Sequence, residues 1–416
     1  MKKLYIRTFG CQMNEADSDE MALAFHQAGF APCDTLSQAD AVLVNTCSVR
    51  EHAEHRAVSY IGRLRLWKER KPGRTVVVAG CAAQRLGRKL KIQFPHVDIV
   101  AGAKSIEEFP SLLTSRGITD APIPLEGESG TASPCAFVTA MRGCSHACSY
   151  CIVPSVRGPA KSLPAEQVLA SAEAKASLGA KEITLLGQTV NAYKDGDTTF
   201  PKLLLGVARL KGVERVRFMS PHPVYMNLEF ADALASEPKL ARHIHLPVQA
   251  GSDRMLSLMK RGYTRAGYLE KIRLLKTAVP DVAISTDFIV GYPTETEEDF
   301  AQTLSLVREA GFSFAYCFKY SPREGTESAA LGEGLVPEEA AQQRLNRLLE
   351  TVREESRRAA SAYAGREIEI LFENARSGRT SQNYWAACES GARPGEMRKA
   401  FVTGVEEMSL KARILP

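Results

Sequence analysis

"TVVVAGCA" (Thr75–Ala82) begins with an unbroken run of small and β-branched residues that leads into Cys81. Such a run predicts a short, fully buried strand. A lone cysteine there would most often pack as a small hydrophobe. However, "LYIRTFGC" ends at Cys11 and "AVLVNTC" ends at Cys47 in the same way. Three strands in series that each end in cysteine indicate a shared role for Cys11, Cys47 and Cys81.

Strands and helices alternate over residues 1–118. This alternation predicts an α/β domain with a doubly wound parallel sheet. Ligands bind outside the carboxyl ends of the strands in such sheets, so the three cysteines can converge on one edge. We expect strands near 3–9, 41–46, 75–80 and 97–101, and helices near 15–28, 50–70, 84–92 and 105–114, the first capped by Asp17 or Ser18.

The composition limits the classes of protein to which the chain can belong. The chain has 416 residues, 44% of them hydrophobic, with ten cysteines and a net charge of +5. No apolar run approaches the roughly 20 residues that span a bilayer, and polar residues interrupt the N-terminus too early for a signal peptide. We therefore expect a cytoplasmic protein without a membrane partner. In that reducing compartment, clustered cysteines favour metal binding or catalysis over disulfides. A monomer is a separate expectation.

The remainder of the chain predicts three further segments. A linker is expected at 119–134, because that stretch is rich in Gly, Pro, Ser and Thr. Six strand–helix units over 135–360 predict a partial parallel barrel, whose site would lie at the carboxyl ends of the strands. A long amphipathic helix is expected at 337–363, and short strands over 361–416 predict a small β-barrel of a type that often binds nucleic acid. The barrel strands are expected near 136–142, 181–186, 214–219, 242–246, 282–290 and 313–319.

A second cysteine group follows the first barrel strand. In "MRGCSHACSYC" (141–151) the spacing is Cys144-x3-Cys148-x2-Cys151. Zinc is one alternative, but a structural zinc site wants a fourth ligand, and His146 inside the loop is poorly placed to supply it. Iron–sulfur clusters are usually held by four cysteines, so three would leave one iron open to another ligand.

This spacing, with Tyr150 just before the third cysteine, resembles the radical S-adenosylmethionine (SAM) superfamily. The whole chain resembles the methylthiotransferases, which add a cluster-binding domain before the radical barrel and a small β domain, TRAM, after it. The resemblance implies S-adenosylmethionine and two 4Fe–4S clusters as cofactors, with no catalytic groups beyond the cluster ligands. One cluster would lie on Cys11, Cys47 and Cys81, and the other on Cys144, Cys148 and Cys151.

Two stretches distinguish the branches of this family. "FGCQMNEADSDEM" (9–21) and "NTCSVREHAEHRA" (45–57) resemble the branch that methylthiolates C2 of N6-dimethylallyl-adenosine at position 37, beside the anticodon of tRNA. One S-adenosylmethionine would donate the methyl group and a second would be the radical source. The alternatives are threonylcarbamoyl-adenosine in tRNA or an aspartate of a ribosomal protein. The ribosomal-protein branch has a Pro-Lys-type sequence where this chain has Gln12 and Met13.

A non-enzymatic iron–sulfur electron carrier is the alternative from another class. Carriers ligate their clusters fully with four cysteines, whereas both groups here have three. An enzyme of the resembled family would need a sulfur donor and a reductant protein such as flavodoxin or ferredoxin.

Other residues are assigned to the cofactor by resemblance. Gln188 and Asn191 could instead cap a turn, and Gln249 and Ser252 could instead cap a helix. The candidates for S-adenosylmethionine binding are Tyr150, Gln188, Asn191, Gln249, Ser252 and Asp287.

Basic residues are the candidates for contacts to tRNA. Arg379, Arg398 and Lys399 in the last segment are candidates for the phosphate backbone, which gives affinity without sequence reading. "RLRLWKERKPGR" (63–74) is a further candidate, although a charge run is at least as often a solvated helix face.

Overall fold

The computed structural model describes residues 1–119, 133–332 and 334–416, so most of the predicted linker at 119–134 lies outside the described residues. The chain divides into two compact units. Unit 1 comprises Met1–Thr131, Arg142–His146 and Cys151–Lys161, and unit 2 comprises Ala132–Met141, Ala147–Tyr150 and Ser162–Pro416. None of the helices in the described ranges is both long enough and apolar enough to cross a membrane.

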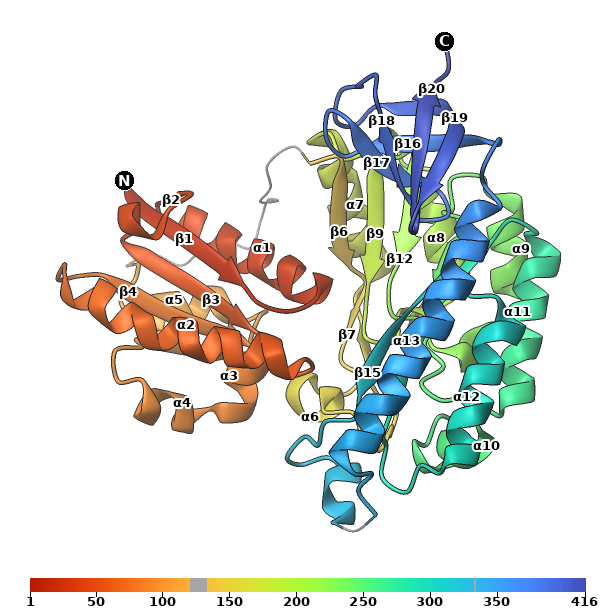
Figure 1. The fold of residues 1–416 in the computed structure, drawn as a ribbon. Helices are drawn as coiled ribbons and strands as arrows, with labels where there is room; N and C mark the ends of the chain where they lie inside the picture. The colour runs from red at the N-terminus through yellow and green to blue at the C-terminus, as the bar shows by residue number, and fades with distance from the viewer. Residues whose placement is uncertain (120–132, 333) are drawn as a thin grey trace. The chain divides into compact units, whose positions relative to one another are not determined.

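Unit 1 is built on a five-stranded parallel sheet in the order β2-β1-β3-β4-β5. Helices cover both faces (Figure 1), with Phe25 and Phe109 in the core on one side and Ile61 and Trp67 in the core on the other. This is the predicted doubly wound sheet. Its elements are β1 Lys2–Thr8, α1 Gln12–Gln27, β2 Phe30–Pro32, β3 Ala41–Thr46, α2 Glu51–Glu69, β4 Thr75–Gly80, α3 Cys81–Leu86, α4 Arg88–Gln93, β5 Ile99–Gly102 and α5 Phe109–Ser115.

Two local predictions for unit 1 are wrong. Helix α1 begins at Gln12 with Cys11 at its N-cap, so Asp17 and Ser18 do not cap it. Both are buried inside the helix, because their side chains have tertiary partners. The helix expected at 84–92 is two short helices, since Gly87 adopts a left-handed φ of +50° between them.

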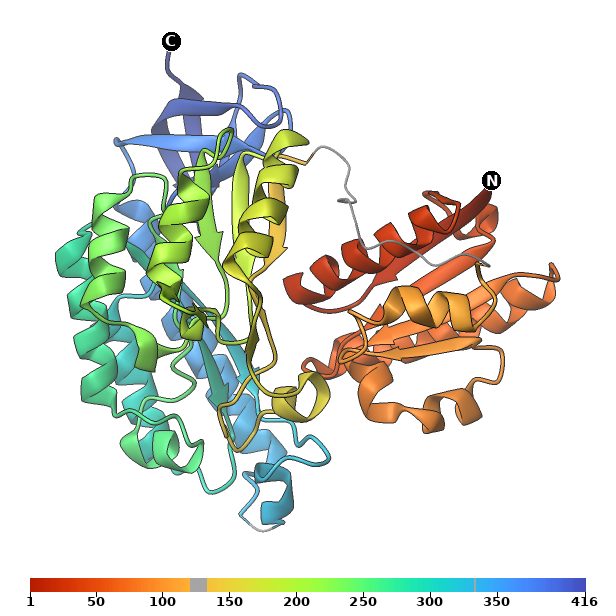
Figure 2. The same ribbon diagram turned by 180° about the vertical axis from the view of Figure 1, so that it is seen from behind.

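Unit 2 contains six parallel strands in two sheets of three, β6-β9-β12 and β13-β14-β15. An isolated parallel bridge between Val216 in β12 and Leu240, which lies just before β13, links the first sheet toward the second. Helices α7 to α12 line the outside of the strands (Figure 2), as predicted for an open parallel barrel. The elements are β6 Cys135–Thr139, α7 Ala165–Ser177, β9 Glu182–Leu186, α8 Phe200–Ala208, β12 Arg215–Phe218, α9 Leu228–Ser236, β13 His243–His245, α10 Asp253–Leu258, α11 Arg265–Ala278, β14 Ala283–Val290, α12 Glu297–Ala310 and β15 Phe314–Lys319. The short elements β7 Met141–Arg142, α6 Val153–Arg157, β8 Lys161–Ser162, β10 Lys194–Asp195 and β11 Thr198–Thr199 complete the middle of the chain.

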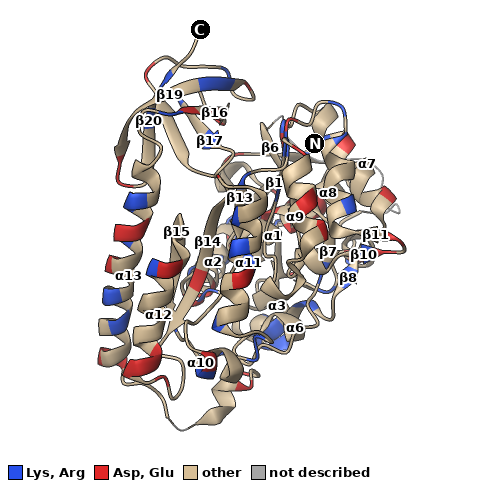
Figure 3. Cartoon of the chain, turned by 90° about the vertical axis from the view of Figure 1, so that its right-hand side faces the viewer, with Lys and Arg blue, Asp and Glu red and all other residues tan. Residues whose placement is uncertain are grey.

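The C-terminal part of unit 2 also follows the prediction. Helix α13 (Glu338–Ser361) buries Leu348 and Val352 and carries charges of both signs along its length (Figure 3). The last five strands close into a barrel in the order β16-β17-β18-β20-β19. They are β16 Glu367–Phe372, β17 Ser377–Thr380, β18 Trp385–Cys388, β19 Met397–Glu406 and β20 Ser409–Ile414.

Two arginines join this small barrel to the larger one. Arg215 and Arg217 in β12 are buried, and both face the carboxylate of Glu182 in β9, at 3.4 and 2.8 Å. Arg215 donates to the backbone carbonyl of Arg379 at 2.8 Å, and Arg217 donates to that of Ser381 at 3.1 Å. A buried charge must be fully paired to be tolerated. This network therefore fixes the end of β17 to the amino ends of the larger barrel's strands.

Candidate functional site

The first three cysteines lie at one edge of the unit 1 sheet. Cys11 precedes α1, Cys47 follows β3, and Cys81 is the first residue of α3. The ends of the strands are level, because Thr8 pairs with Asn45 and Thr46 pairs with Gly80. A Cβ atom built on Gly10 would lie 3.1 Å from the Cβ of Cys47. The fold thus brings the three cysteine-bearing turns together.

Buried polar side chains hold these turns in place. The Asn14 side-chain amide donates to Asn45 Oδ1 at 2.9 Å and to the carbonyl of Thr46 at 3.1 Å. The Thr46 hydroxyl donates to the carbonyl of Ala79 at 2.6 Å and accepts from the N–H of Ala83 at 3.1 Å. Each turn is therefore tied to the next by hydrogen bonds that burial strengthens.

The surroundings of the thiols fit an iron–sulfur cluster. Burial raises the pKa of Cys81 to about 11, against the opposing influence of Arg157, and burial also raises the pKa of Cys47. Both thiols would release a proton when they bind metal. The buried hydroxyl of Ser48 has no hydrogen-bond partner in the described part of the chain. Thiol donors, a buried cation and an unused hydroxyl suit an anionic cluster.

A single metal ion is not suited to these positions. Zinc needs four ligands within about 2.3 Å of one point. Over the described ranges, no three His, Cys, Asp or Glu side chains are grouped in a way that could hold one ion. In a cluster each thiolate binds a different iron, so the thiols need not converge on one point.

Gly80 lies where the turns at this edge of the sheet pack closely. Its φ is +96°, and an added Cβ would lie 2.3 Å from Asn45 Oδ1 and 2.4 Å from the Thr46 carbonyl oxygen. Gly73 has a similar φ of +84° but nothing within 4 Å of an added Cβ. Strain alone costs roughly 1–3 kcal/mol at either site. We expect Gly80→Ala to lower the free energy of unfolding by at least about 2 kcal/mol more than Gly73→Ala, because overpacking adds to strain.

The fluorescence of Trp67 during urea unfolding measures this difference. The chain has two tryptophans, so a Trp385→Phe background leaves Trp67 as the reporter of unit 1. Equal losses for the two glycine variants would show that the turns can move apart.

The second cysteine group follows β7. Gly143 has a φ of +73°, and a Cβ there would lie 2.0 Å from the carbonyl oxygen of Pro159. The N–H of Cys144 donates to the carbonyl of Gly158 at 3.0 Å. These contacts join the start of the cysteine segment, at Gly143 and Cys144, to Gly158 and Pro159 within unit 1.

Arg261 lies against the middle of this cysteine group, within unit 2. Its guanidinium is buried and donates to Cys148 Sγ at 3.2 Å and to the Tyr150 hydroxyl at 3.3 Å. It also donates to Tyr263 and to the carbonyl of Pro247. A fixed positive charge at this distance from sulfur suits a ligand of an anionic cluster. Nothing in the local sequence around "MKRGY" pointed to this residue.

Asp17 is a second residue that the sequence did not reveal. Its carboxylate is fully buried and accepts from Arg142 at 2.6 Å and from Arg157 at 2.8 Å. The two arginines flank the cysteine loop within unit 1. Removing one partner of such a buried group typically costs about 3–5 kcal/mol, so Asp17 anchors the loop.

The predicted cofactor residues differ in how their side chains are used. Gln188 Oε1 is buried and has no partner in the described part of the chain, so it can accept from a ligand such as an ammonium group. Asn191 instead exchanges two hydrogen bonds with the backbone of His222, at 2.9 and 2.7 Å. Gln249 has a φ of +79° and donates its N–H to the carbonyl of Asp287 at 2.9 Å.

Ser252 caps helix α10, which is the alternative weighed for it. Its hydroxyl accepts from the N–H of Met255 and donates to Asp299 at 2.7 Å. The carboxylate of Asp299 also pairs with Arg254, and these donors lower its pKa despite the cost of burial. The cofactor roles of Tyr150, Gln188, Asn191, Gln249, Ser252 and Asp287 remain predictions.

Polar and aromatic side chains line the inner face of the larger barrel. Residues Ile244, Ile284 and Phe288 face the helices, so their neighbours in the strands face inward. His243 and His245 both lie 2.9 Å from the Ser285 hydroxyl, and His245 lies 3.3 Å from Asp287. The period-two alternation in "HIH" and "AISTDFIV" could have indicated from the sequence that these polar residues share the inner face.

Two aromatic rings on β15 remain open to solvent beside this polar group. Tyr316 packs edge-on against His245 with 5.9 Å between ring centroids and is 50% exposed, and Phe318 is 39% exposed. Exposed rings next to hydrogen-bonding groups are suited to a planar, polar ligand.

The basic residues predicted to contact RNA are used unequally. All three are exposed, but Arg379 donates to Glu373 and Asn383 and stacks on Trp385, and Arg398 lies 3.9 Å from Glu396. In the 63–74 stretch, Lys68 pairs with Asp98 and Lys71 with Asp40. Much of that charge is therefore neutralised within the protein.

Comparison with known proteins identifies the class. Residues 3–102 match the model described as Uncharacterized protein family UPF0004, and residues 138–307 match the Radical SAM superfamily. A solved radical S-adenosylmethionine methyltransferase, TsrM from Kitasatospora setae, superposes with a TM-score of 0.59 at 15% identity, over 79% of this chain and 77% of that one. At that identity the likeness shows the fold alone. The open barrel, the Cys-x3-Cys-x2-Cys loop and the superfamily match define a radical S-adenosylmethionine enzyme, which uses that cofactor and iron–sulfur clusters.

Closer relatives identify the family. A protein from Alkalilimnicola ehrlichii named tRNA-2-methylthio-N(6)-dimethylallyladenosine synthase is 42% identical, over 92% of this chain and 90% of its own length. Its namesake from Sorangium cellulosum is 40% identical over 100% of this chain and 90% of its own. The chain belongs to this synthase family, which confirms the family predicted from its sequence motifs.

Proposed function

We propose that this protein methylthiolates C2 of N6-dimethylallyl-adenosine beside the anticodon of tRNA. The observation that carries the proposal is the pair of three-cysteine groups in a chain of this family. One group lies at the carboxyl ends of β1, β3 and β4, and the other lies in the segment after β7. Each group would leave one iron of its cluster without a protein ligand. That pattern supports two clusters with different tasks better than it supports electron transport.

We assign the tasks by segment. Residues 1–118 would bind the auxiliary cluster through Cys11, Cys47 and Cys81, and residues 135–360 would form the radical core with Cys144, Cys148 and Cys151. Residues 361–416 would hold the tRNA backbone through Arg379, Arg398 and Lys399. A cytoplasmic reductant protein such as flavodoxin or ferredoxin and a separate sulfur donor would complete the system.

The C2–H bond of adenine is not acidic, so acid–base groups cannot activate it. The bound S-adenosylmethionine and clusters supply radical and sulfur chemistry when present, and the protein supplies orientation. Arg261 would hold Cys148 and Tyr150, and Gln188 would accept a hydrogen bond from the cofactor's amino group. On the inner face of the barrel, Asp287 would lie beside the cofactor, His245 would hydrogen-bond the target base, and Tyr316 would pack against that base.

The target base must leave its stack to reach that face. A single-stranded anticodon loop makes this extrusion inexpensive. The small barrel is joined to the amino ends of the strands by Arg215 and Arg217, whereas the cysteine loop lies at the carboxyl ends. The RNA would therefore be gripped about one strand length, roughly 17–20 Å, from the reacting base.

Mass spectrometry of tRNA nucleosides from a strain that lacks this gene tests the function. We expect dimethylallyl-adenosine to accumulate without its methylthio group, and plasmid-borne wild-type protein to restore the product. Loss of the methylthio group from threonylcarbamoyl-adenosine, or from a ribosomal-protein aspartate, would assign the chain to another branch. Unchanged nucleosides and ribosomal proteins would refute the enzymatic role.

A further inference from the structure

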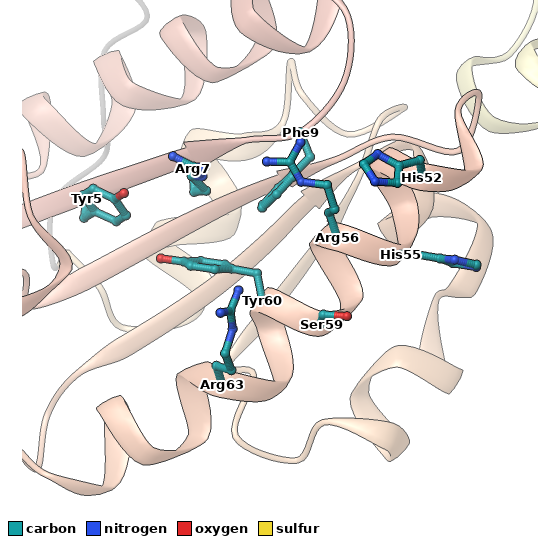
Figure 4. A pocket seen from close by; sticks show the side chains of 9 residues that line it. All are labelled: Tyr5, Arg7, Phe9, His52, His55, Arg56, Ser59, Tyr60 and Arg63. Carbon is teal, nitrogen blue, oxygen red and sulfur yellow. The ribbon is translucent and has the colours of Figure 1, made fainter.

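A recess in unit 1 lies between strand β1 and helix α2, with a volume of ≈ 380 Å³ (Figure 4). Pockets of this size accommodate small-molecule ligands of about nucleotide size. Neither the cysteines nor any residue assigned to the cofactor lines it. The residues that line it include Tyr5, Arg7, Phe9, Arg56, Tyr60 and Arg63.

The recess is built by one face of α2 opposite β1. His52, Arg56 and Arg63 follow one another at intervals of four and seven residues, which places them on the same side of a helix. Arg7 comes from the facing strand. In Figure 4 the side chains of His55 and Ser59 point away from Tyr5 and Arg7, so the arginines and the aromatic rings dominate the recess.

Arginines and aromatic rings alternate across it. The guanidinium carbons of Arg7 and Arg56 lie 5.6 and 5.8 Å from the centre of the Phe9 ring. That of Arg63 lies 5.6 Å from the Tyr60 ring, and the two rings are 5.8 Å apart. Phe9 is buried beneath the arginines while Tyr60 is half-buried. The exposed cations are thus held in place by the rings.

These arginines differ from their neighbours in being electrostatically unpaired. Arg7, Arg56 and Arg63 are exposed, and none forms an ion pair with a carboxylate of the described residues. On the same helix, Arg65 pairs with Glu69 and Lys68 pairs with Asp98. Three unpaired guanidiniums around one recess create a site for an anion with more than one charge, and arginine suits phosphate best because its planar fork binds two oxygens at once.

We propose that this recess binds the sugar–phosphate backbone of single-stranded RNA, with one unstacked nucleobase against Tyr60. Interleaved arginine and aromatic side chains are the combination that binds single-stranded nucleic acid. Phe9 lies two residues before Cys11 and His52 lies five residues after Cys47, so the recess adjoins the edge of the sheet that carries the first cysteine group. The inference rests on the proposed function in one respect, that the RNA is the tRNA substrate.

Binding of an anticodon stem-loop RNA carrying dimethylallyl-adenosine to the full-length holoprotein tests the proposal. The variant is Arg7→Ala/Arg56→Ala/Arg63→Ala. The matched control is Arg88→Ala/Lys89→Ala/Lys91→Ala, which removes the same charge from exposed positions on α4. Fluorescence anisotropy at several salt concentrations gives both the affinity and its salt dependence.

Loss of three single-strand phosphate contacts should weaken binding about 50-fold at 0.15 M salt and reduce the log–log salt slope by about 2. The control should bind like wild type, and both variants should keep their iron and cleave S-adenosylmethionine. Equal affinities and slopes for the two variants would overturn the inference. So would unchanged RNA binding together with loss of reduction by an acidic electron-transfer protein, because the recess would then dock a protein.

These results separate the inference from the proposed function. If the wild type binds and methylthiolates the RNA while the recess variant behaves like the control, only the inference fails. If the wild type binds the RNA through the recess but makes no methylthio product, the recess is an RNA site and the proposed function fails.

Discussion

Replacing Cys81 with alanine is expected to abolish the methylthio product while S-adenosylmethionine is still cleaved to 5′-deoxyadenosine. Cys81 is buried at the sheet edge with Cys47 and beside Arg157, so alanine leaves the first cluster with two thiol ligands. The radical core keeps all three of its cysteines. The loss should exceed the roughly 10–100-fold effect of residues that only support a metal ligand.

Product formation and 5′-deoxyadenosine are measured on the same reconstituted protein. The control is Cys33→Ala, because Cys33 is half-buried and its sulfur donates to the backbone carbonyl of Thr35. Normal methylthio product from Cys81→Ala would remove the first cysteine group from the reaction. Loss of both products would instead mean that the two groups cannot be separated.

Replacing Cys144, Cys148 and Cys151 together with alanine is expected to halve the bound iron and to eliminate 5′-deoxyadenosine. Two 4Fe–4S clusters carry about eight irons, so about four should remain on the first group. The guanidinium of Arg261 would lose its contact with the Cys148 sulfur but keep Tyr263 and Pro247, so the barrel should stay folded. Iron analysis of the purified variant measures the bound iron, and circular dichroism shows whether the barrel is folded. Product analysis measures 5′-deoxyadenosine.

A second triple variant, Cys11→Ala/Cys47→Ala/Cys81→Ala, makes the comparison symmetrical. It should also retain about four irons, but it should still cleave S-adenosylmethionine. Changing all six cysteines should leave none. Because both groups serve one reaction, the losses of methylthio product should not add. A Cys144/Cys148/Cys151 variant that keeps eight irons would show that these cysteines are not the ligands.

Periodicity in the sequence predicted much of this protein. Apolar runs such as 75–80 and the alternating stretch 282–290 specify strands, because a buried strand needs uninterrupted or period-two apolar residues. The long helix at 337–363 follows from its 3.6-residue pattern. The alternation of strands and helices predicted a parallel sheet. The cysteines at the strand ends could then be placed on one edge of it, since parallel strands share their carboxyl ends. Family motifs then identified the chemistry.

Side-chain partnerships were decided only by the tertiary structure. Asp17 was predicted as a cap because local sequence favours it there, but it pairs with Arg142, which lies 125 positions away. The local sequence also does not show which basic side chains are paired with carboxylates. "RLRLWKERKPGR" looks uniformly basic, yet Lys68 and Lys71 are neutralised by carboxylates about 30 positions distant while Arg63 is not. Sequence determines which residues share a strand or a helix face, whereas pairing of charges depends on which faces meet, and that is settled by packing.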